Sequence, residues 1–144
     1  MLKFSMSGLS EICSLYQKYY PNLLFQIYGD HDIIDRYPQT LPSVMGELIG
    51  NCVERPNRPA GTVSIKISTK EIRISDDVTF SPDEIKTILG NLNSSTPRST
   101  KPFQDGMPDG GAGVIGSRRR LDQIGGKLDY FQQNGNIVAR VKLC

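Results

Sequence analysis

The amino-acid sequence predicts an α+β fold, a two-layer sandwich with helices on one face of a mostly antiparallel sheet. Segments with apolar residues at helical spacing alternate with short segments in which apolar and polar residues alternate. At two places, two strand-like segments follow one another directly, which is typical of antiparallel pairs. The 144 residues contain no internal repeat, so we predict a single domain over residues 1–144.

The first half of the chain contains two amphipathic helical patterns on either side of a short apolar run. Pro21 stops the first helix, because proline cannot continue the backbone hydrogen-bond ladder. The second pattern is the stronger one, with Thr40 placed to cap the helix and Pro42 in its first turn. The predicted elements are a helix over 9–19, a strand over 23–28, a connector over 29–39 and a helix over 41–55.

The second half predicts two strand pairs separated by helices and one long loop. Residues 63–67 and 72–74 alternate apolar and polar side chains, which predicts a half-buried antiparallel pair. Ser81-Pro82-Asp83-Glu84 is a helix start, with serine as the cap and glutamate three residues later. Residues 93–112 show no periodicity and predict a lid-like loop. A helix to about residue 124 follows, then strands over 127–132 and 137–143 joined at Asn134-Gly135.

The composition argues against several functional classes. A net charge of +2 gives the chain no strong overall attraction to nucleic acid or to an anionic membrane. No apolar run is long enough to span a membrane, and no secretory signal is visible. The three cysteines, Cys13, Cys52 and Cys144, lack metal-ligand spacing, so we expect reduced thiols and a cytoplasmic location. The same location is expected if this domain was excised from a membrane-bound sensor.

Glu47 and Asn51 are the first candidate site residues. They are one helical turn apart, on the flank of the apolar stripe of the helix over 41–55. A carboxylate at the edge of a cleft can deprotonate or orient a nucleophile, and an amide oxygen suits Mg²⁺. The alternative interpretation is an ordinary solvated helix edge, because amphipathic helices have polar flanks.

Two further segments have residues suited to binding a nucleotide. Asp76 ends a strand-like run, where a buried carboxylate would accept a hydrogen bond from the amino group of adenine; it is also an ordinary turn residue. The segment from Gly111 to Gly116 leaves backbone N–H groups open where a helix begins, which favours anion binding, and Arg118 follows. A flexible loop with a solvated basic face is the alternative there.

The three segments in this order resemble the ATP-binding domain of the GHKL superfamily. Residues 111–128 have the form G-x-G-x-x-G-x-R-x-R-L-x-x-x-x-G-x-L, which resembles the second glycine box of sensor histidine kinases that partner NarL-type response regulators. Residues 47–53, E-L-I-G-N-C-V, resemble the asparagine box of that family. The resemblance covers nearly the whole chain, from about Leu9 to Leu143, and implies the GHKL (Bergerat) ATP-binding fold.

The resemblance implies a role for each matching residue. Glu47 would be the catalytic base, Asn51 would coordinate Mg²⁺ on the nucleotide phosphates, and Asp76 would recognise adenine. The implied cofactors are ATP and Mg²⁺. The remaining nucleotide-binding residues would be Arg55, Asp77, Gly111, Gly113, Gly116 and Arg118.

Two features depart from the family pattern. The first glycine box, D-x-G-x-G in the family, is Asp76-Asp77-Val78-Thr79-Phe80 here and has lost both glycines. The single histidine, His31, follows a strand-like run and does not lie on a long helix, so we interpret it as a loop residue. The phosphoacceptor histidine would then belong to a dimerisation domain outside this chain, and a response regulator would receive the phosphate.

The sequence leaves three functions open. The first is the catalytic, ATP-binding domain of a sensor histidine kinase, in which the γ-phosphate passes to a histidine elsewhere. The second is a degenerate GHKL domain that docks to a partner without nucleotide, which Val78 and Thr79 favour. The third is an anti-sigma-type serine kinase of the same fold. Direct contact with nucleic acid is not expected for any of them.

Overall fold

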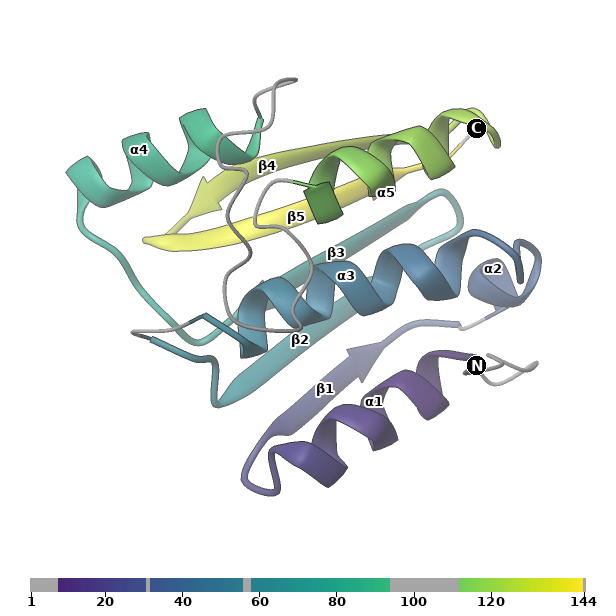
Figure 1. The fold of residues 1–144 in the computed structure, drawn as a ribbon, viewed down its shortest axis with the longest axis horizontal. Helices are drawn as coiled ribbons and strands as arrows, with labels where there is room; N and C mark the ends of the chain where they lie inside the picture. Colours follow the sequence, from purple (N-terminus) through teal and green to yellow (C-terminus); the bar gives the residue numbers. More distant parts are fainter. Residues whose placement is uncertain (1–7, 31, 56–57, 94–111, 144) are drawn as a thin grey trace.

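The computed structural model describes residues 8–30, 32–55, 58–93 and 112–143, in which helices lie on one face of a five-stranded sheet (Figure 1). The α+β architecture expected from the sequence is confirmed. In chain order the elements are α1 (Gly8–Tyr19), β1 (Leu24–Tyr28), α2 (Asp32–Asp35), α3 (Leu41–Val53), β2 (Thr62–Ile67), β3 (Glu71–Asp76), α4 (Pro82–Leu92), α5 (Ala112–Asp122), β4 (Lys127–Gln133) and β5 (Asn136–Lys142).

The sheet has the strand order β1-β2-β3-β5-β4 and is antiparallel except where β1 runs parallel to β2. The connection between these two parallel strands contains α2 and α3, because parallel neighbours need a long crossover. In the antiparallel pair, Ile65 lies opposite Ile74, so the apolar side chains share one face. The same register places Asp76, the last residue of β3, opposite Val63. A carboxylate therefore ends the strand on the inner face, between sheet and helices.

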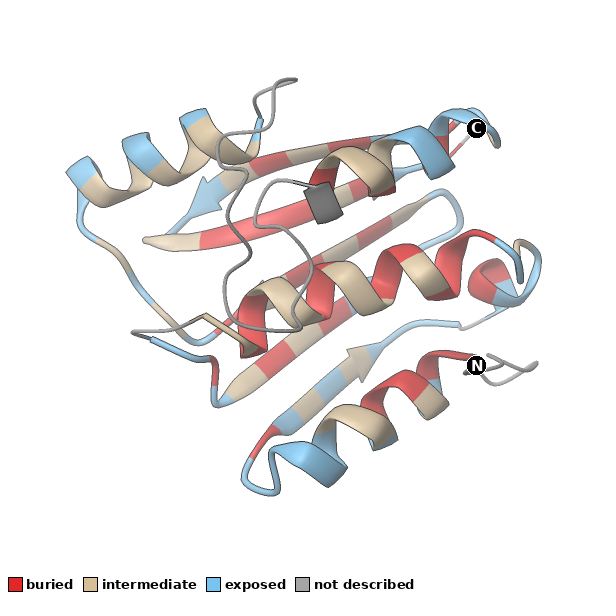
Figure 2. Ribbon diagram, viewed as in Figure 1, coloured by how far each residue is buried: buried red, intermediate tan, exposed pale blue. Residues whose placement is uncertain are grey.

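The hydrophobic core lies between the sheet and the helices, and α3 crosses its centre. Figure 2 shows buried residues along the whole length of α3, which packs against both α1 and α5. Leu48 of this helix is 1% exposed, and burying one such side chain contributes about 2 kcal/mol. Since the buried stripe fixes the rotation of α3, the polar residues on its flanks are held at the edge of the interlayer space.

The connector predicted over residues 29–39 contains a short helix, α2, which the sequence analysis missed. Four residues are too few to show helical periodicity, and α2 is stabilised instead by burial of Ile33 and Ile34 in the core. Thr40 stands at the N-cap of α3 as predicted, but its hydroxyl makes no capping hydrogen bond. The helix itself ends at Val53, slightly earlier than expected.

The local signals of the second half are confirmed. Ser81 and Glu84 form a reciprocal capping box at the start of α4. Asn134 and Gly135 have φ values of 54° and 84°, as a type I′ turn between β4 and β5 requires. Of the lid-like loop predicted over 93–112, residues 94–111 lie outside the described part of the chain. Within the described ranges, no helix is long and apolar enough to cross a membrane.

Candidate functional site

Helix α3 presents Glu47 and Asn51 at the edge of its buried stripe, both half-buried. Burial raises the pKa of Tyr16 and of Glu54, and the nearby charge of Glu47 raises the pKa of both groups further. Burial also raises the pKa of Tyr130 in β4, and the adjacent Asn51 side chain partly opposes that shift. Glu47 therefore lies near the α1 side of the helix, whereas Asn51 lies beside β4.

Three buried polar atoms on neighbouring elements have no hydrogen-bond partner among the described residues: Asn51 Nδ2, Ser117 Oγ and Tyr130 Oη. They come from α3, α5 and β4, and α5 packs against both of the other elements. Asn51 is close enough to Tyr130 to influence its pKa, but the two groups are not aligned for a regular hydrogen bond. An unpaired buried polar group costs about 1–3 kcal/mol, so a polar ligand at this place would relieve an existing penalty.

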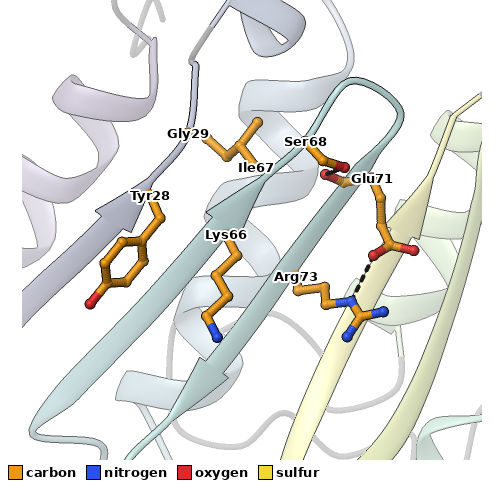
Figure 3. Close-up of a pocket in the computed structure, with 7 residues that line it drawn as sticks. All are labelled: Tyr28, Gly29, Lys66, Ile67, Ser68, Glu71 and Arg73. Atoms are coloured by element: carbon orange, nitrogen blue, oxygen red, sulfur yellow. Dashed lines mark hydrogen bonds and ion pairs between the residues drawn. The ribbon is translucent and has the colours of Figure 1, made fainter.

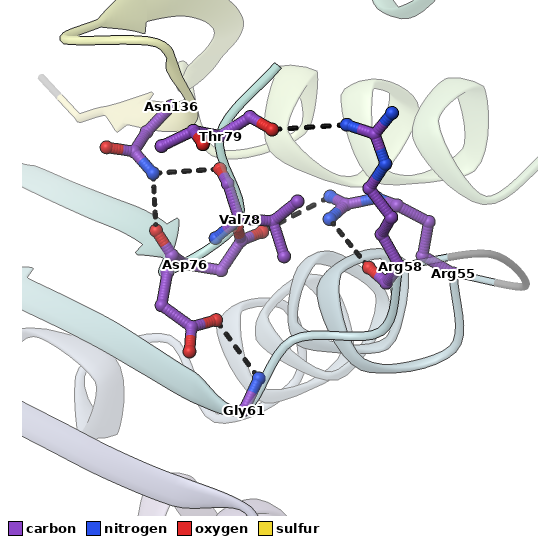
Figure 4. A network of polar contacts seen from close by, with 8 residues as sticks. Arg55, Arg58, Gly61, Asp76, Val78, Thr79 and Asn136 are labelled. Carbon is purple, nitrogen blue, oxygen red and sulfur yellow. Dashed lines mark hydrogen bonds and ion pairs between the residues drawn. The ribbon is translucent and has the colours of Figure 1, made fainter.

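Asp76 is buried at the end of β3, and both of its carboxylate oxygens already have partners. Oδ2 accepts a hydrogen bond from Arg55 Nη2 at 3.2 Å, and Oδ1 accepts one from the backbone N–H of Val78 at 2.8 Å (Figure 4). The Asp76 side chain is 1% exposed and that of Arg55 is 24% exposed. Cys52 of α3 lies near the same carboxylate, whose charge adds to burial in raising the thiol pKa. Because the carboxylate is 1% exposed, an adenine amino group could reach it only if a covering side chain such as Arg55 moved aside.

Arg55 and Arg58 enclose the ring of Phe80 from the segment that follows α3. Each guanidinium carbon lies 5.1 Å from the ring centroid, a distance at which cations and aromatic rings attract. Arg58 also donates to the Thr79 carbonyl at 3.2 Å and pairs with Glu84 at 2.6 Å, at the start of α4. These contacts tie the end of α3 to the loop that follows β3.

The loop after β3 is held from two sides. The Asn136 side chain donates to the carbonyl oxygens of Asp76 at 2.9 Å and Val78 at 2.8 Å (Figure 4). On the other side, the backbone N–H of Gly61 donates to the Asp77 carboxylate at 3.0 Å. This is the segment in which the resembling family has two glycines. In this chain, hydrogen bonds within the domain hold both the main chain of this segment and the side chain of Asp77.

The glycine-rich segment is described only from the start of α5. Gly111 lies outside the described residues, as does His31. Gly113 lies in the first turn of α5 and Gly116 in the second. Arg118 is half-buried and donates to a carbonyl oxygen of β4 at 3.3 Å and to one at the end of α4 at 2.8 Å. Those two hydrogen bonds join α5 to its neighbours.

Cys13 and Cys52 are free and buried, as the sequence predicts, and Cys144 lies outside the described residues. Burial raises the pKa of Cys13 to about 12, and it also raises that of Cys52, so both remain thiols at neutral pH. Among the described side chains, no group of three His, Cys, Asp or Glu residues could hold a metal ion. A Mg²⁺ ion at this site would therefore depend on the phosphates of a ligand for most of its coordination.

Comparison with known proteins supports the fold. No family model matches the sequence, and no curated protein sequence matches it. Solved structures do match. The catalytic domain of histidine kinase ThkA, in a nucleotide-free form, has a TM-score of 0.56 and 16% identity over 95% of this chain and 91% of that chain. The histidine kinase AdeS of Acinetobacter baumannii has a TM-score of 0.57 and 15% identity over 99% of this chain and 66% of that one. This chain has the fold of a histidine kinase catalytic domain.

The same fold occurs in the blue-light activated histidine kinase of Erythrobacter litoralis EL346, with a TM-score of 0.62 and 13% identity. The match covers 94% of this chain but only 40% of that kinase, so the present chain corresponds to one part of a longer protein there. Likeness at such identities establishes the fold, whereas activity depends on the residues of the site.

In this histidine kinase fold, the ends of α3 and β3 meet, and α5 packs beside α3. Asn51 and Asp76 therefore lie on adjoining elements, and the Asp76 carboxylate lies near Cys52, the residue after Asn51. Arg55 pairs with Asp76 in this structure, and its role in nucleotide binding stays a prediction. The sequence analysis did not single out Arg58, Phe80, Ser117, Tyr130 and Asn136. The contacts of Arg58, Phe80 and Asn136 join distant segments, and only the Arg-x-x-Arg spacing of 55–58 was a local signal.

Proposed function

We propose that this chain is the ATP-binding catalytic domain of a histidine kinase, which delivers the γ-phosphate of ATP to a histidine outside the chain. The fold supports this proposal, together with the unpaired side-chain N–H of Asn51 beside Tyr130 and the unpaired hydroxyl group of Ser117 on the neighbouring helix α5. These unpaired groups are the observation on which the proposal depends. A domain that had abandoned ligand binding would lose stability by keeping three buried polar atoms without partners.

The phosphate side of the site fits Mg·ATP in its residue chemistry. Asn51 offers an amide oxygen to Mg²⁺ and an unpaired N–H group to a phosphate oxygen. When bound, Mg²⁺ would neutralise charge on the phosphates during transfer. Glu47 would orient or deprotonate the attacking histidine. The backbone of the glycine segment (Gly111, Gly113 and Gly116) would bind phosphate, with Arg118 held nearby by its contacts to β4 and α4.

The adenine side fits only after a rearrangement. Asp76 would accept a hydrogen bond from the adenine amino group, and in this structure Arg55 donates to its Oδ2. Asp77, the other acid of the segment, accepts a hydrogen bond from Gly61. Binding of adenine would therefore require Arg55 to leave Asp76. The exchange lowers affinity by the free energy of the ion pair.

The remaining partners follow from the same proposal. A histidine-bearing dimerisation domain, in another chain or in another part of a longer protein, would receive the phosphate. A response regulator would then accept it, and the reaction would take place in the cytoplasm.

A specific observation favours a second candidate, a docking module without nucleotide. Arg55, Arg58 and Phe80 form a self-contained cluster over Asp76, and Val78 stands where the family has glycine. If these contacts do not open, adenine cannot reach Asp76. The domain would then act only by binding a partner protein at its surface.

Calorimetric titration with ATP and with a non-hydrolysable analogue, each with and without Mg²⁺, separates the two candidates. We expect Mg²⁺-dependent binding between micromolar and submillimolar affinity, or roughly −5 to −8 kcal/mol. Asn51→Ala should abolish the Mg²⁺ dependence, and Asn91→Ala on α4 is the matched control. A folded domain that gives no heat with either nucleotide would refute the kinase proposal and support the docking module.

A further inference from the structure

The face of the sheet turned away from α3, called the outer face below, has a row of cations across its strands. Tyr28 pairs with Lys66, Lys66 with Arg73, and Arg73 with Arg140, each as direct cross-strand partners. Side chains of directly paired residues project to the same side of a sheet, and Figure 3 shows Tyr28, Lys66 and Arg73 doing so. Three positive charges thus stand side by side on β2, β3 and β5.

Two of these three cations are neutralised within the domain and one is not. Arg73 pairs with Glu71 at 2.6 Å, and Arg140 pairs with Asp129 at 2.7 Å. Both guanidinium groups also lie over the ring of Phe131, at 5.3 and 4.7 Å from its centroid. Lys66 is exposed and forms no ion pair with any described residue. Like charges directly opposite each other destabilise a sheet, so an anion beside Lys66 would remove an unfavourable interaction.

The uncompensated lysine opens onto a depression of about 360 Å³ between β1 and the β2–β3 turn. Tyr28, Lys66 and Arg73 line it along the strands, and Ser68 and Glu71 close it at the turn (Figure 3). Tyr28 of the edge strand β1, which is 53% exposed, lines the depression on one side. The site therefore combines a cation, hydroxyl groups and an exposed aromatic ring.

The outer face is more positively charged than the chain as a whole, which has a net charge of +2. Among the residues that the strands direct to this face, only Glu71 and Asp129 are carboxylates. The cations of the face are Lys66, Arg73, Lys127, Arg140 and Lys142.

We infer that the outer face docks an acidic segment of a partner protein, with a carboxylate at Lys66 and an apolar side chain against the ring of Tyr28. Two features favour a mixed acidic and apolar peptide over a nucleic acid or a lipid surface. Glu71 and Asp129 interrupt the positive charge and would repel a continuous polyanion. The exposed ring of Tyr28 lies at one end of the cation row, beside Lys66, and an apolar side chain docked against it would be removed from water. This inference does not depend on nucleotide binding.

The test is fluorescence anisotropy of the whole chain with a fluorescein-labelled peptide of glutamates interspersed with leucines. A peptide with glutamine in place of glutamate is the control for charge. We expect the acidic peptide to bind and the glutamine peptide not to bind, with binding weakened at high ionic strength. Lys66→Glu should weaken binding by about tenfold or more, and Tyr28→Ala should weaken it less. Lys86→Glu, at an exposed lysine on α4, should leave it unchanged.

Three outcomes would overturn the inference. The first is no binding by the folded wild-type chain. The second is equal loss of binding in Lys66→Glu and Lys86→Glu, which would indicate non-specific attraction to net charge. The third is stronger binding of polyuridylate RNA or of phosphatidylserine vesicles than of the acidic peptide. Circular dichroism of each variant verifies that it is folded, and Lys66 is exposed, so its replacement should not disturb the sheet.

Discussion

Truncation of Arg55 to alanine tests the central feature of the candidate site, the pairing of Arg55 with Asp76. The variant loses the contact of Nη2 with Asp76 Oδ2 at 3.2 Å and the stacking on Phe80 at 5.1 Å. Asp76, whose side chain is 1% exposed in the intact domain, then loses its cation and keeps the hydrogen bond from the Val78 N–H. Removing one partner of a fully buried pair costs about 3–5 kcal/mol. Because Arg55 is 24% exposed, solvent screens the pair, and we expect a loss of about 2–3 kcal/mol in unfolding free energy.

The same substitution should change nucleotide binding in the opposite direction. If adenine must displace Arg55 from Asp76, the variant no longer pays that cost, and Oδ2 is free to accept the amino group. An ion pair that contributes about 1.4 kcal/mol to the free domain corresponds to a tenfold difference in affinity. Arg55→Ala should therefore be less stable and yet bind ATP about tenfold more tightly. Urea unfolding gives the first quantity, and calorimetric titration below the unfolding temperature gives the second.

Arg58→Ala is the matched control, because Arg58 stacks on the same ring but does not contact Asp76. Its ion pair with Glu84 is 45% and 40% exposed, so its loss should cost less than about 1 kcal/mol. The affinity for ATP should hardly change. If the two variants lose equal stability, the buried carboxylate does not depend on Arg55. If Arg55→Ala binds ATP more weakly than the wild type, Arg55 is a ligand of the nucleotide and does not obstruct it.

Two further predictions concern the framework around the site. Burial, and then the charge of Glu47, raise the pKa of Glu54 in the folded domain above its value in the unfolded chain. The domain is therefore most stable with respect to this group below the unfolded pKa, where the carboxyl group is protonated in both states. This stability is lost as the pH rises through the folded pKa. Glu54→Gln should raise the melting temperature at pH 7 by a small amount, and the gain should vanish near pH 4; an equal gain at both values would contradict this assignment. Gly29 has a φ of 104°, and a Cβ atom there would lie 2.0 Å from the Ile67 carbonyl oxygen. Gly29→Ala should therefore lower the unfolding free energy by about 2–4 kcal/mol, as measured by urea unfolding. Gly90→Ala, in helix α4 with nothing within 4 Å of the added carbon, should instead stabilise by about 0.5–1 kcal/mol, and equal effects at both positions would refute the geometric reason.

The parts of the fold that the sequence predicted are those specified by neighbouring residues. The capping box at Ser81 and the turn at Asn134-Gly135 are local, so their residue types are sufficient to identify them. The helix α3 was predicted because its apolar stripe extends over several turns. By contrast, α2 is four residues long and is stabilised by the burial of two isoleucines, a tertiary effect that leaves no periodic pattern.

For the candidate site, the nucleotide-binding roles that the sequence indicated stay predictions, and the sequence could not indicate what those residues contact within the domain. The structure places Asn51 and Asp76 on adjoining elements, α3 and β3. The partner of Asp76 is 21 residues away along the chain, so no local pattern could identify Arg55 as that partner. Arg118 was assigned to a phosphate from its place after the glycines, and only the structure reveals its hydrogen bonds to β4 and α4. Long side chains with several donors are the hardest to assign from sequence, because their reach spans more than one element.

The loss of the two glycines and the pairing of Arg55 with Asp76 have a common physical basis. Glycines after the aspartate would leave the main chain free to move, whereas Val78 is β-branched and stiff. Asn136 fixes the carbonyl oxygens on both sides of Asp77, and the two arginines hold Phe80, so the loop has one supported conformation in the free domain. In that conformation the Asp76 carboxylate pairs with Arg55, just after the end of α3, and a buried carboxylate without a cation would be unstable. A Val78→Gly substitution should therefore loosen the loop without releasing Asp76, and only its combination with Arg55→Ala should open the adenine side fully.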